Sequence, residues 1–334
     1  VFHCAESEVV PRVKRFIEGS KQVRPRVQGS ADGGRELPRL AEDVEVESIS
    51  VTDFGRYLKS PYLFYLERVA KLECLDDRAR ELDPMGFGIL AHDVLNRFGR
   101  DDQMRDERDE ARLGKFLTET LESLCSKRYG RHPLPAVQLQ LEQLAQRLRS
   151  FAAAPAKRRE EGWVIRETEW SPSEGHVAFV VDGTPIRLTG QIDRIDHHPE
   201  KQEWAIWDYK TGESVDPPLN AHRKMNGEWI DLQLPLYCNL AVELLGDAVP
   251  AEVGYIALPR DEKEIGFRGI NRWARGKNDP ETFEEGMESA LEAAYEVVRG
   301  IRRGDFFDDD AFAPRDQIFA AIGGLGTITG SEDE

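Results

Sequence analysis

The stretch QIDRIDHHPEKQEWAIWDYKTGE, residues Gln191–Glu213, contains two apolar runs separated by the turn-like segment HHPEK. Runs of this kind around a polar turn predict two neighbouring strands. Asp193 lies near the end of the first strand, and Asp208 and Lys210 close the second. Because strand side chains alternate between faces, Asp208 and Lys210 point the same way, with Tyr209 between them. If the strands pair, both carboxylates and the ammonium group converge within a few ångströms.

Such a convergence of charges has a specific chemistry. Two carboxylates in close contact repel each other and raise each other's pKa, and a divalent cation removes this penalty. Oxygen ligands suit Mg²⁺ or Mn²⁺. A lysine beside the cation can stabilise or deprotonate an attacking water, or hold a scissile phosphate. The stretch therefore predicts a metal site that acts on phosphate.

The bare spacing also fits an ordinary surface ion pair. In that alternative Asp208 pairs with Lys210, or Asp193 pairs with Arg194, and no metal is involved. Asp196 is interpreted as structural, either pairing with Arg194 or capping the turn. The spacing alone leaves both interpretations open.

Composition bounds the class of protein. The chain has 334 residues, of which 40% are hydrophobic and 32% charged, so it can bury a core under a solvated surface. A net charge of −17 argues against a protein that coats nucleic acid, which is usually basic. Net charge concerns solubility and steering, so it does not exclude an acidic site that binds metal and meets phosphate.

The cysteines and the chain start indicate the compartment. No CxxC spacing or Cys/His cluster is present, which argues against a zinc site or a disulfide framework. A reducing cytosol is therefore expected. The sequence contains no run of about 18 apolar residues, so no membrane-spanning helix is predicted. The start lacks a signal-peptide pattern and an initiator Met, so we expect a piece of a longer chain.

His197 and His198, which lie in the segment HHPEK between the two expected strands, are interpreted as turn residues.

The N-terminal half divides into an arm and a helical part. Residues 1–45 are rich in Arg, Gly, Pro and Ser without an apolar period, which predicts a linker, a flexible arm or an ordinary disordered tail. Helical periodicity covers about 50–160, beginning with a helix capped by Ser50 or Thr52. At the other end of the chain, the Gly-rich residues 313–334 are expected to be loose.

The second half predicts a sheet core over about 161–260. HVAFVVDGTPIRLTGQIDRID predicts two strands around the hairpin turn Asp182–Gly183, so three or four antiparallel strands are expected in mid-chain. DLQLPLYCNLAVELLG predicts one helix ending at Gly246, and AEVGYIAL predicts a further strand. A last helix is expected over about 280–303, with Pro280 near its first position. The pattern predicts a mixed α/β domain with helices flanking a central sheet.

Taken in order, these segments resemble the PD-(D/E)XK nuclease superfamily, specifically its RecB/AddB-type nuclease domain. The resemblance implies a restriction-endonuclease-like core over about 46–312: a central mixed sheet with an antiparallel hairpin, flanked by helices and carrying a helical insert. The opening segment SVTDFGRYLKSPYLFYLERV resembles the first helix of such domains. Each motif is weak alone, but five in order are specific. The other four are GFGILAHDVL with Gly88 and His92, GQIDRID with Asp193, WDYKTG with Asp208 and Lys210, and DLQLPLY with Gln233 and Tyr237.

The resemblance implies a role for each matching residue. His92, Asp193 and Asp208 would ligate the metal, assisted by the backbone carbonyl of Tyr209. Lys210 would be the catalytic lysine. Because a histidine ligand is softer than an all-oxygen shell, we expect Mn²⁺ to support activity at least as well as Mg²⁺.

Three further residues flank this set. The resemblance implies that Gln233 and Tyr237 lie along the substrate channel, where they touch DNA or support the lysine. Glu169, in RETEW, is a possible further acidic contributor on the first strand. The alternative for Glu169 is an ordinary surface position on that strand.

The chain departs from the resemblance at the cysteines. Many AddB-type domains hold an iron–sulfur cluster with one cysteine in the opening helix and three after the last helix. Here Ser60 occupies the opening position, and the last segment has no cysteine. Because thiolates are needed to hold such a cluster, no iron–sulfur cluster is expected.

The leading interpretation is a metal-dependent DNA nuclease, expected to act as an exonuclease on a single strand or duplex end. No P-loop sequence is present, so a helicase motor would lie upstream or on a partner. One alternative is a non-catalytic module of the same fold that binds DNA ends. Another is a nuclease that acts on RNA.

Overall fold

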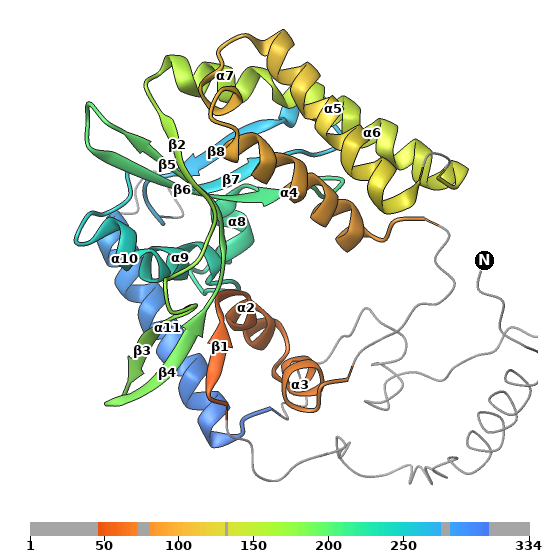
Figure 1. The fold of residues 1–334 in the computed structure, drawn as a ribbon. Helices are drawn as coiled ribbons and strands as arrows, with labels where there is room; N and C mark the ends of the chain where they lie inside the picture. The colour runs from red at the N-terminus through yellow and green to blue at the C-terminus, as the bar shows by residue number, and fades with distance from the viewer. Residues whose placement is uncertain (1–45, 73–80, 131–132, 275–280, 307–334) are drawn as a thin grey trace, which may run out of the picture. The chain divides into compact units, whose positions relative to one another are not determined.

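The computed structural model describes residues 46–72, 81–130, 133–274 and 281–306 (Figure 1). All of them belong to the unit Pro38–Glu334. The expected arm over 1–45 and the expected tail over 313–334 lie outside the described residues. In the described part, no helix is long and apolar enough to cross a membrane.

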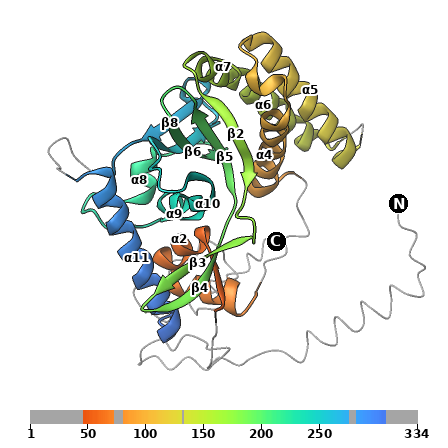
Figure 2. The ribbon, with the colours of Figure 1, turned by 60° about the vertical axis from the view of Figure 1, so that its left-hand side comes forward.

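A five-stranded mixed sheet forms the centre, as predicted. Only the β6–β7 pair is parallel, and the other neighbours are antiparallel. The interior strand β5 is buried along nearly its whole length and the central strand β6 is buried through its middle, because helices cover both faces of the sheet (Figures 1 and 2). In spatial order the strands are β2 (Val164–Trp170), β5 (Ile192–His198), β6 (Glu203–Lys210), β7 (Glu252–Ala257) and β8 (Gly266–Ile270).

The predicted hairpin forms a second, separate sheet. β3 (His176–Val181) and β4 (Thr184–Thr189) pair across the turn Asp182–Gly183, where φ is 52° and 76°. Positive φ at both positions is the geometry of a tight hairpin turn and suits an Asp-Gly pair. β1 (Ser48–Ser50) pairs in parallel with the other edge of β4, giving the order β1-β4-β3.

The prediction of two strands in HVAFVVDGTPIRLTGQIDRID is wrong, because this segment contains three. Gly190 separates β4 from β5 and packs closely against its neighbours. A Cβ at this position would lie 2.9 Å from Val51 and 3.0 Å from Leu240. The chain therefore changes sheets at a residue that only glycine fits without displacement, and the hairpin does not extend the central sheet.

The predicted helical block packs against the central sheet. Leu113, Leu117 and Leu121 recur at every fourth residue of α5 and are buried against a core that includes Trp207 and Tyr209. Each such buried leucine contributes about 1.5–3 kcal/mol. In Figure 1, α4 lies next to the sheet and α5 and α6 lie outside it. The block consists of α4 (Pro84–Arg100), α5 (Glu110–Tyr129), α6 (Pro135–Phe151) and α7 (Ala153–Glu160), with a 3₁₀ turn at Met104–Asp106.

The opening segment folds as its sequence predicts. Ser50 is the N-cap of α2 (Val51–Lys59), and its N–H donates to Asp53 Oδ2 at 3.0 Å. Ser60, which stands where the resemblance expects a cysteine, caps α3 (Pro61–Phe64) by accepting the Leu63 N–H at 3.2 Å. A π-helical turn follows at Tyr65–Val69.

The C-terminal half shows three differences from the prediction. The helix expected to run to Gly246 divides into α9 (Gln233–Leu240) and α10 (Val242–Leu245). The last helix, α11, begins at Phe283 after the cap Thr282, and Pro280 lies outside the described residues. Strand β8 was not predicted. The remaining elements are α8 (Pro218–His222), a 3₁₀ turn at Glu262–Glu264, and α11, which ends at Arg303.

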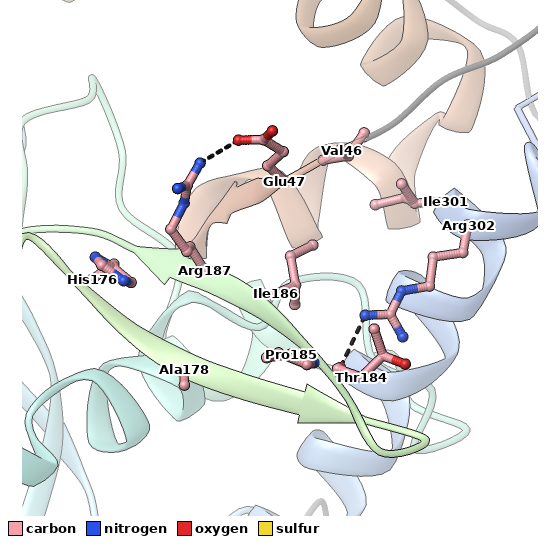
Figure 3. Close-up of a pocket in the computed structure, with 10 residues that line it drawn as sticks. All are labelled: Val46, Glu47, His176, Ala178, Thr184, Pro185, Ile186, Arg187, Ile301 and Arg302. Atoms are coloured by element: carbon pink, nitrogen blue, oxygen red, sulfur yellow. Dashed lines mark hydrogen bonds and ion pairs between the residues drawn. The ribbon is translucent and has the colours of Figure 1, made fainter.

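A hollow lies on the smaller sheet (Figure 3). It is lined by residues of β3, β4 and α11 and by Val46 and Glu47, just before β1, and an ion pair between Arg187 and Glu47 spans part of it. None of the residues singled out in the sequence lines this hollow. The predicted site instead lies at the ends of the central strands.

Candidate active site

The antiparallel pairing of β5 with β6 brings two of the predicted carboxylates together, because Asp193 lies at the start of β5, not near its end as expected, and β6 ends beside it. Arg194 pairs with Trp207, so the next position places Asp193 opposite Asp208. Here the ladder ends in a side-chain contact, because the Tyr209 N–H donates to Asp193 Oδ2 at 2.6 Å. Burial leaves the Asp193 side chain only 10% exposed.

Glu169 reaches the same place from the neighbouring strand. In the β2–β5 ladder it falls between two pairs, which places it opposite Asp193. Its backbone is left-handed, with φ of 49°. For a residue other than glycine, this conformation costs on the order of 1–3 kcal/mol, and such strained residues cluster at functional sites as well as in turns. Burial raises the pKa of Glu169, and the charge of Asp193 raises it further.

His92 completes a three-residue group. Its Nδ1 lies 3.4 Å from Asp193 Oδ1 and 4.0 Å from Glu169 Oε1. One candidate ligand atom from each of the three residues lies within 4.8 Å of the others. Burial alone would lower the pKa of His92. The hydrogen bond and charge of Asp193, together with the charges of Asp208 and Glu169, outweigh burial and raise it.

The spacing between Gly88 and His92 has a structural reason. Residues four apart lie on one side of a helix, so both face the strand ends. A Cβ at position 88 would lie 3.4 Å from the Thr211 hydroxyl oxygen, just after β6. The glycine lets α4 approach the end of β6 closely, and His92 then reaches Asp193. The His92 ring also contacts the Tyr209 ring edge-on, with centroids 5.4 Å apart.

A second group surrounds Asp208 and faces α9. Lys210 Nζ lies 2.6 Å from Asp208 Oδ2, and it donates to Gln233 Oε1 at 3.2 Å. Asp208 Oδ1 accepts from Gln233 Nε2 at 2.9 Å and from the Tyr237 hydroxyl at 3.2 Å. Burial lowers the pKa of Lys210, but the charge and hydrogen bond of Asp208 outweigh burial and raise it.

The structure thus brings all of the predicted side chains together, in two adjoining groups. The group with the geometry of a cation site contains His92, Asp193 and Glu169. Asp208 was expected among the ligands, and its carboxylate is held by Lys210 and α9. Tyr209 contacts the cation-site group through its ring and its N–H, and the role of its carbonyl stays a prediction.

Neither surface ion pair describes the site. Asp208 and Lys210 do form an ion pair, but the Asp208 side chain is only 5% exposed, so the pair is not at the surface. Asp193 does not pair with Arg194. The Arg194 guanidinium instead donates to both oxygens of Asp196 at 2.7 and 3.1 Å, inside the protein. This confirms the structural interpretation of Asp196.

The interpretation of His197 and His198 as turn residues is wrong. Both belong to the last two positions of β5. His198 is buried, and its Nε2 lies 3.0 Å from the Glu161 carbonyl oxygen, at the end of α7. The strand extends two residues further than the sequence indicated, because both positions still pair with β6, and the His198 ring packs edge-on against Trp163.

Asp231 lies beside the site and was not predicted from the sequence. Asp231 precedes α9, and its Oδ1 accepts the Gln233 N–H at 2.9 Å. Its Oδ2 accepts from Lys59 of α2 at 3.2 Å. The available signal was its residue type, because an aspartate just before a helix is a common capping residue. Asp231 therefore fixes the start of the helix that carries Gln233 and Tyr237.

The chain is similar to a known protein family over most of its length. A family model described as the PD-(D/E)XK nuclease superfamily matches residues 48–313. The chain is also 23% identical over 209 residues to a subunit of the ATP-dependent helicase/deoxyribonuclease of Clostridium acetobutylicum. That match covers 58% of this chain and 18% of the relative, so the chain spans under a fifth of that protein. The similarity to the helicase/deoxyribonuclease subunit supports a domain of RecB/AddB type, and by the extent of the family match the chain belongs to the PD-(D/E)XK nuclease superfamily.

Proposed function

We propose that this domain is a metal-dependent nuclease that hydrolyses phosphodiester bonds in DNA. The observation that carries the proposal is the junction of the two groups at the strand ends. The cation-site group of His92, Glu169 and Asp193 adjoins a lysine held by Asp208. Metal ligands beside a fixed ammonium group suit chemistry at a phosphate.

The donor set fits a divalent cation. One nitrogen and two carboxylate oxygens lie within 4.8 Å of one another, and ligand atoms around one such ion lie about 3–4 Å apart, so small side-chain movements suffice. When bound, Mg²⁺ or Mn²⁺ would offset phosphate charge and lower the pKa of a water. His92 favours Mn²⁺. Asp208 and the Tyr209 carbonyl are proposed as further ligands from β6, as the resemblance implies.

Lys210 has the geometry to hold a substrate phosphate or the attacking water. An ammonium group has three N–H donors. Two of them are directed to Asp208 and Gln233, and the Lys210 side chain is still 35% exposed. The third donor is therefore available to a phosphate oxygen or water. Tyr237 and Gln233 hold the Asp208 carboxylate, which in turn fixes the position of the lysine.

The proposed biological setting rests on the similar protein. The relative from Clostridium acetobutylicum is named as part of a helicase/deoxyribonuclease, which supports DNA as substrate. We propose exonuclease action on a single strand or duplex end delivered by a helicase motor, elsewhere in the full-length chain or on a partner. A bacterial-type cytosol or nucleoid fits this role.

A cleavage assay tests the proposal. Labelled single- and double-stranded DNA and RNA are incubated with the protein and Mg²⁺, Mn²⁺ or EDTA. We expect metal-dependent cleavage of DNA by the wild type and by Lys201→Ala, a surface control, and only a slow residual rate from Lys210→Ala. Undiminished cutting by Lys210→Ala would refute the site assignment. Cleavage of RNA alone would favour a nuclease that acts on RNA. Binding of DNA ends by the wild type without cleavage would favour a non-catalytic module of the same fold.

A further inference from the structure

A buried tyrosine lies beneath the lysine of the proposed site. Tyr255 of β7 pairs with Asp208 of β6, so their side chains share a face of the sheet. Lys210 Nζ lies over the Tyr255 ring, 5.1 Å from its centroid. Tyr255 is 4% exposed, so its side of the contact is largely shielded from water. A cation over a desolvated aromatic face is held more strongly than one in solvent.

A fully buried histidine holds the hydroxyl of this tyrosine. His222 Nδ1 lies 2.9 Å from the Asp231 carbonyl oxygen, and its Nε2 lies 2.8 Å from the Tyr255 hydroxyl. A carbonyl only accepts, so Nδ1 carries the proton and Nε2 accepts from the tyrosine. Burial lowers the pKa of His222, which agrees with a neutral ring. Donation of the hydroxyl to Nε2 leaves the phenol ring richer in electrons.

The contacts close into a ring of residues around the lysine. Asp231 fixes His222 through its carbonyl and Gln233 through its carboxylate. The face of the Tyr255 ring contacts the Lys210 ammonium, and Gln233 accepts a hydrogen bond from the same ammonium at 3.2 Å. Two paths from one aspartate therefore meet at Lys210 Nζ.

We propose that Tyr255 and His222 are positioning residues for Lys210. The Tyr255 ring keeps the ammonium directed toward Asp208 and Gln233, and His222 keeps the ring in place and electron-rich. Neither residue contacts the cation-site group directly. The catalytic consequence rests on the proposed function of Lys210, but the geometry does not.

The geometry is tested by NMR of lysine side chains labelled with ¹³C at the ε position. In the wild type, the aromatic ring should shift the Lys210 ε-methylene signal upfield, and Lys210→Arg identifies that signal. Tyr255→Phe should keep the shift, Tyr255→Leu should abolish it, and His222→Gln should reduce it. Phe267→Leu, on the neighbouring strand β8, is the matched aromatic control. Circular dichroism and thermal melting establish that each variant is folded.

Two results would overturn the positioning role, whether or not hydrolysis is detected. One is a wild-type Lys210 signal at the ordinary lysine position. The other is an unchanged signal in folded Tyr255→Leu. If Tyr255→Leu does not fold, His222→Gln decides, and an unchanged signal in that variant refutes the network.

Kinetics then connect the geometry to catalysis. We expect Tyr255→Leu to lower kcat about tenfold with little change in KM, and Tyr255→Phe to lower it less. In the Lys210→Ala background, Tyr255→Leu should cause no additional loss, because it acts through the lysine. A loss of equal size in both backgrounds would show a merely structural role. An inactive wild type would refute the proposed function, while the NMR result would still decide the positioning.

Discussion

Replacing Glu169 by glutamine should stabilise the metal-free protein and weaken its binding of Mn²⁺. The ligand oxygens of Glu169 and Asp193 lie within 4.8 Å of each other, and the Glu169 side chain is 16% exposed. At that separation and an effective dielectric constant of about 20, two charges repel by about 3 kcal/mol. The positive charge of His92 offsets part of this, so a net gain of about 1 kcal/mol is expected without metal.

Metal should reverse the order of stability. A ligand that binds the folded state stabilises it by about 2.7 kcal/mol at 100 times its Kd. If loss of the carboxylate raises Kd about tenfold, the same Mn²⁺ concentration stabilises Glu169→Gln by only about 1.4 kcal/mol. The substitution should therefore raise the free energy of unfolding in EDTA and lower the increment that Mn²⁺ adds.

Urea denaturation with and without Mn²⁺ measures both quantities. Glu167→Gln, on the same strand but outside the cation-site group, should change neither by more than about 0.5 kcal/mol. An unchanged Mn²⁺ increment in Glu169→Gln would remove Glu169 from the ligand set. A lower stability of this variant in EDTA would refute the repulsion argument.

Two further substitutions and one labelling experiment test the protein around the site. Arg147 is 4% exposed and donates to two carbonyls just beyond β6 and β7. In urea denaturation, Arg147→Ala should lower the free energy of unfolding by about 2–4 kcal/mol, whereas the neighbouring Arg149→Ala should leave it unchanged. Asp196→Ala should cost about 3–5 kcal/mol in the same assay because it leaves the buried Arg194 without its partner. Burial raises the pKa of the Cys125 thiol to about 11, so at pH 8 only about one thiol in a thousand is ionised. Labelling of Cys125 with a thiol reagent, followed by mass spectrometry, should therefore be slow at pH 8 and become faster as the pH rises. Rapid labelling of native Cys125 at pH 8 would contradict that burial.

The sequence could predict the contacts that follow from local periodicity. Alternation along a strand places Asp208 and Lys210 on one face, and they form an ion pair at 2.6 Å. Helical spacing places Gly88 and His92 on one side of α4. The Gln233-x-x-x-Tyr237 spacing likewise brings both side chains to one Asp208 oxygen. In each case a regular backbone period fixes the geometry.

The rest depended on tertiary structure. Periodicity could not place Glu169, because its left-handed backbone and the bulge between Ile165 and Glu167 interrupt the regular strand. His222 and Tyr255 are 33 residues apart, and no local pattern links them. Strand β8 lacks a strong apolar alternation and is held in place by its pairing with β7. These features arise when distant segments pack, so a single sequence carries little sign of them.

The division of oxygens at the two aspartates explains why the site is one unit. Asp193 Oδ2 accepts the Tyr209 N–H, and Asp193 Oδ1 faces His92. Asp208 Oδ1 accepts a hydrogen bond from Gln233 of α9, and Asp208 Oδ2 pairs with Lys210. If Asp208 also binds the cation, it must share an oxygen that now holds the lysine or the helix. Metal affinity and the position of Lys210 are then coupled, because both compete for the same carboxylate. A substitution of Lys210 would therefore leave metal binding intact or tighten it, even though cleavage is largely lost.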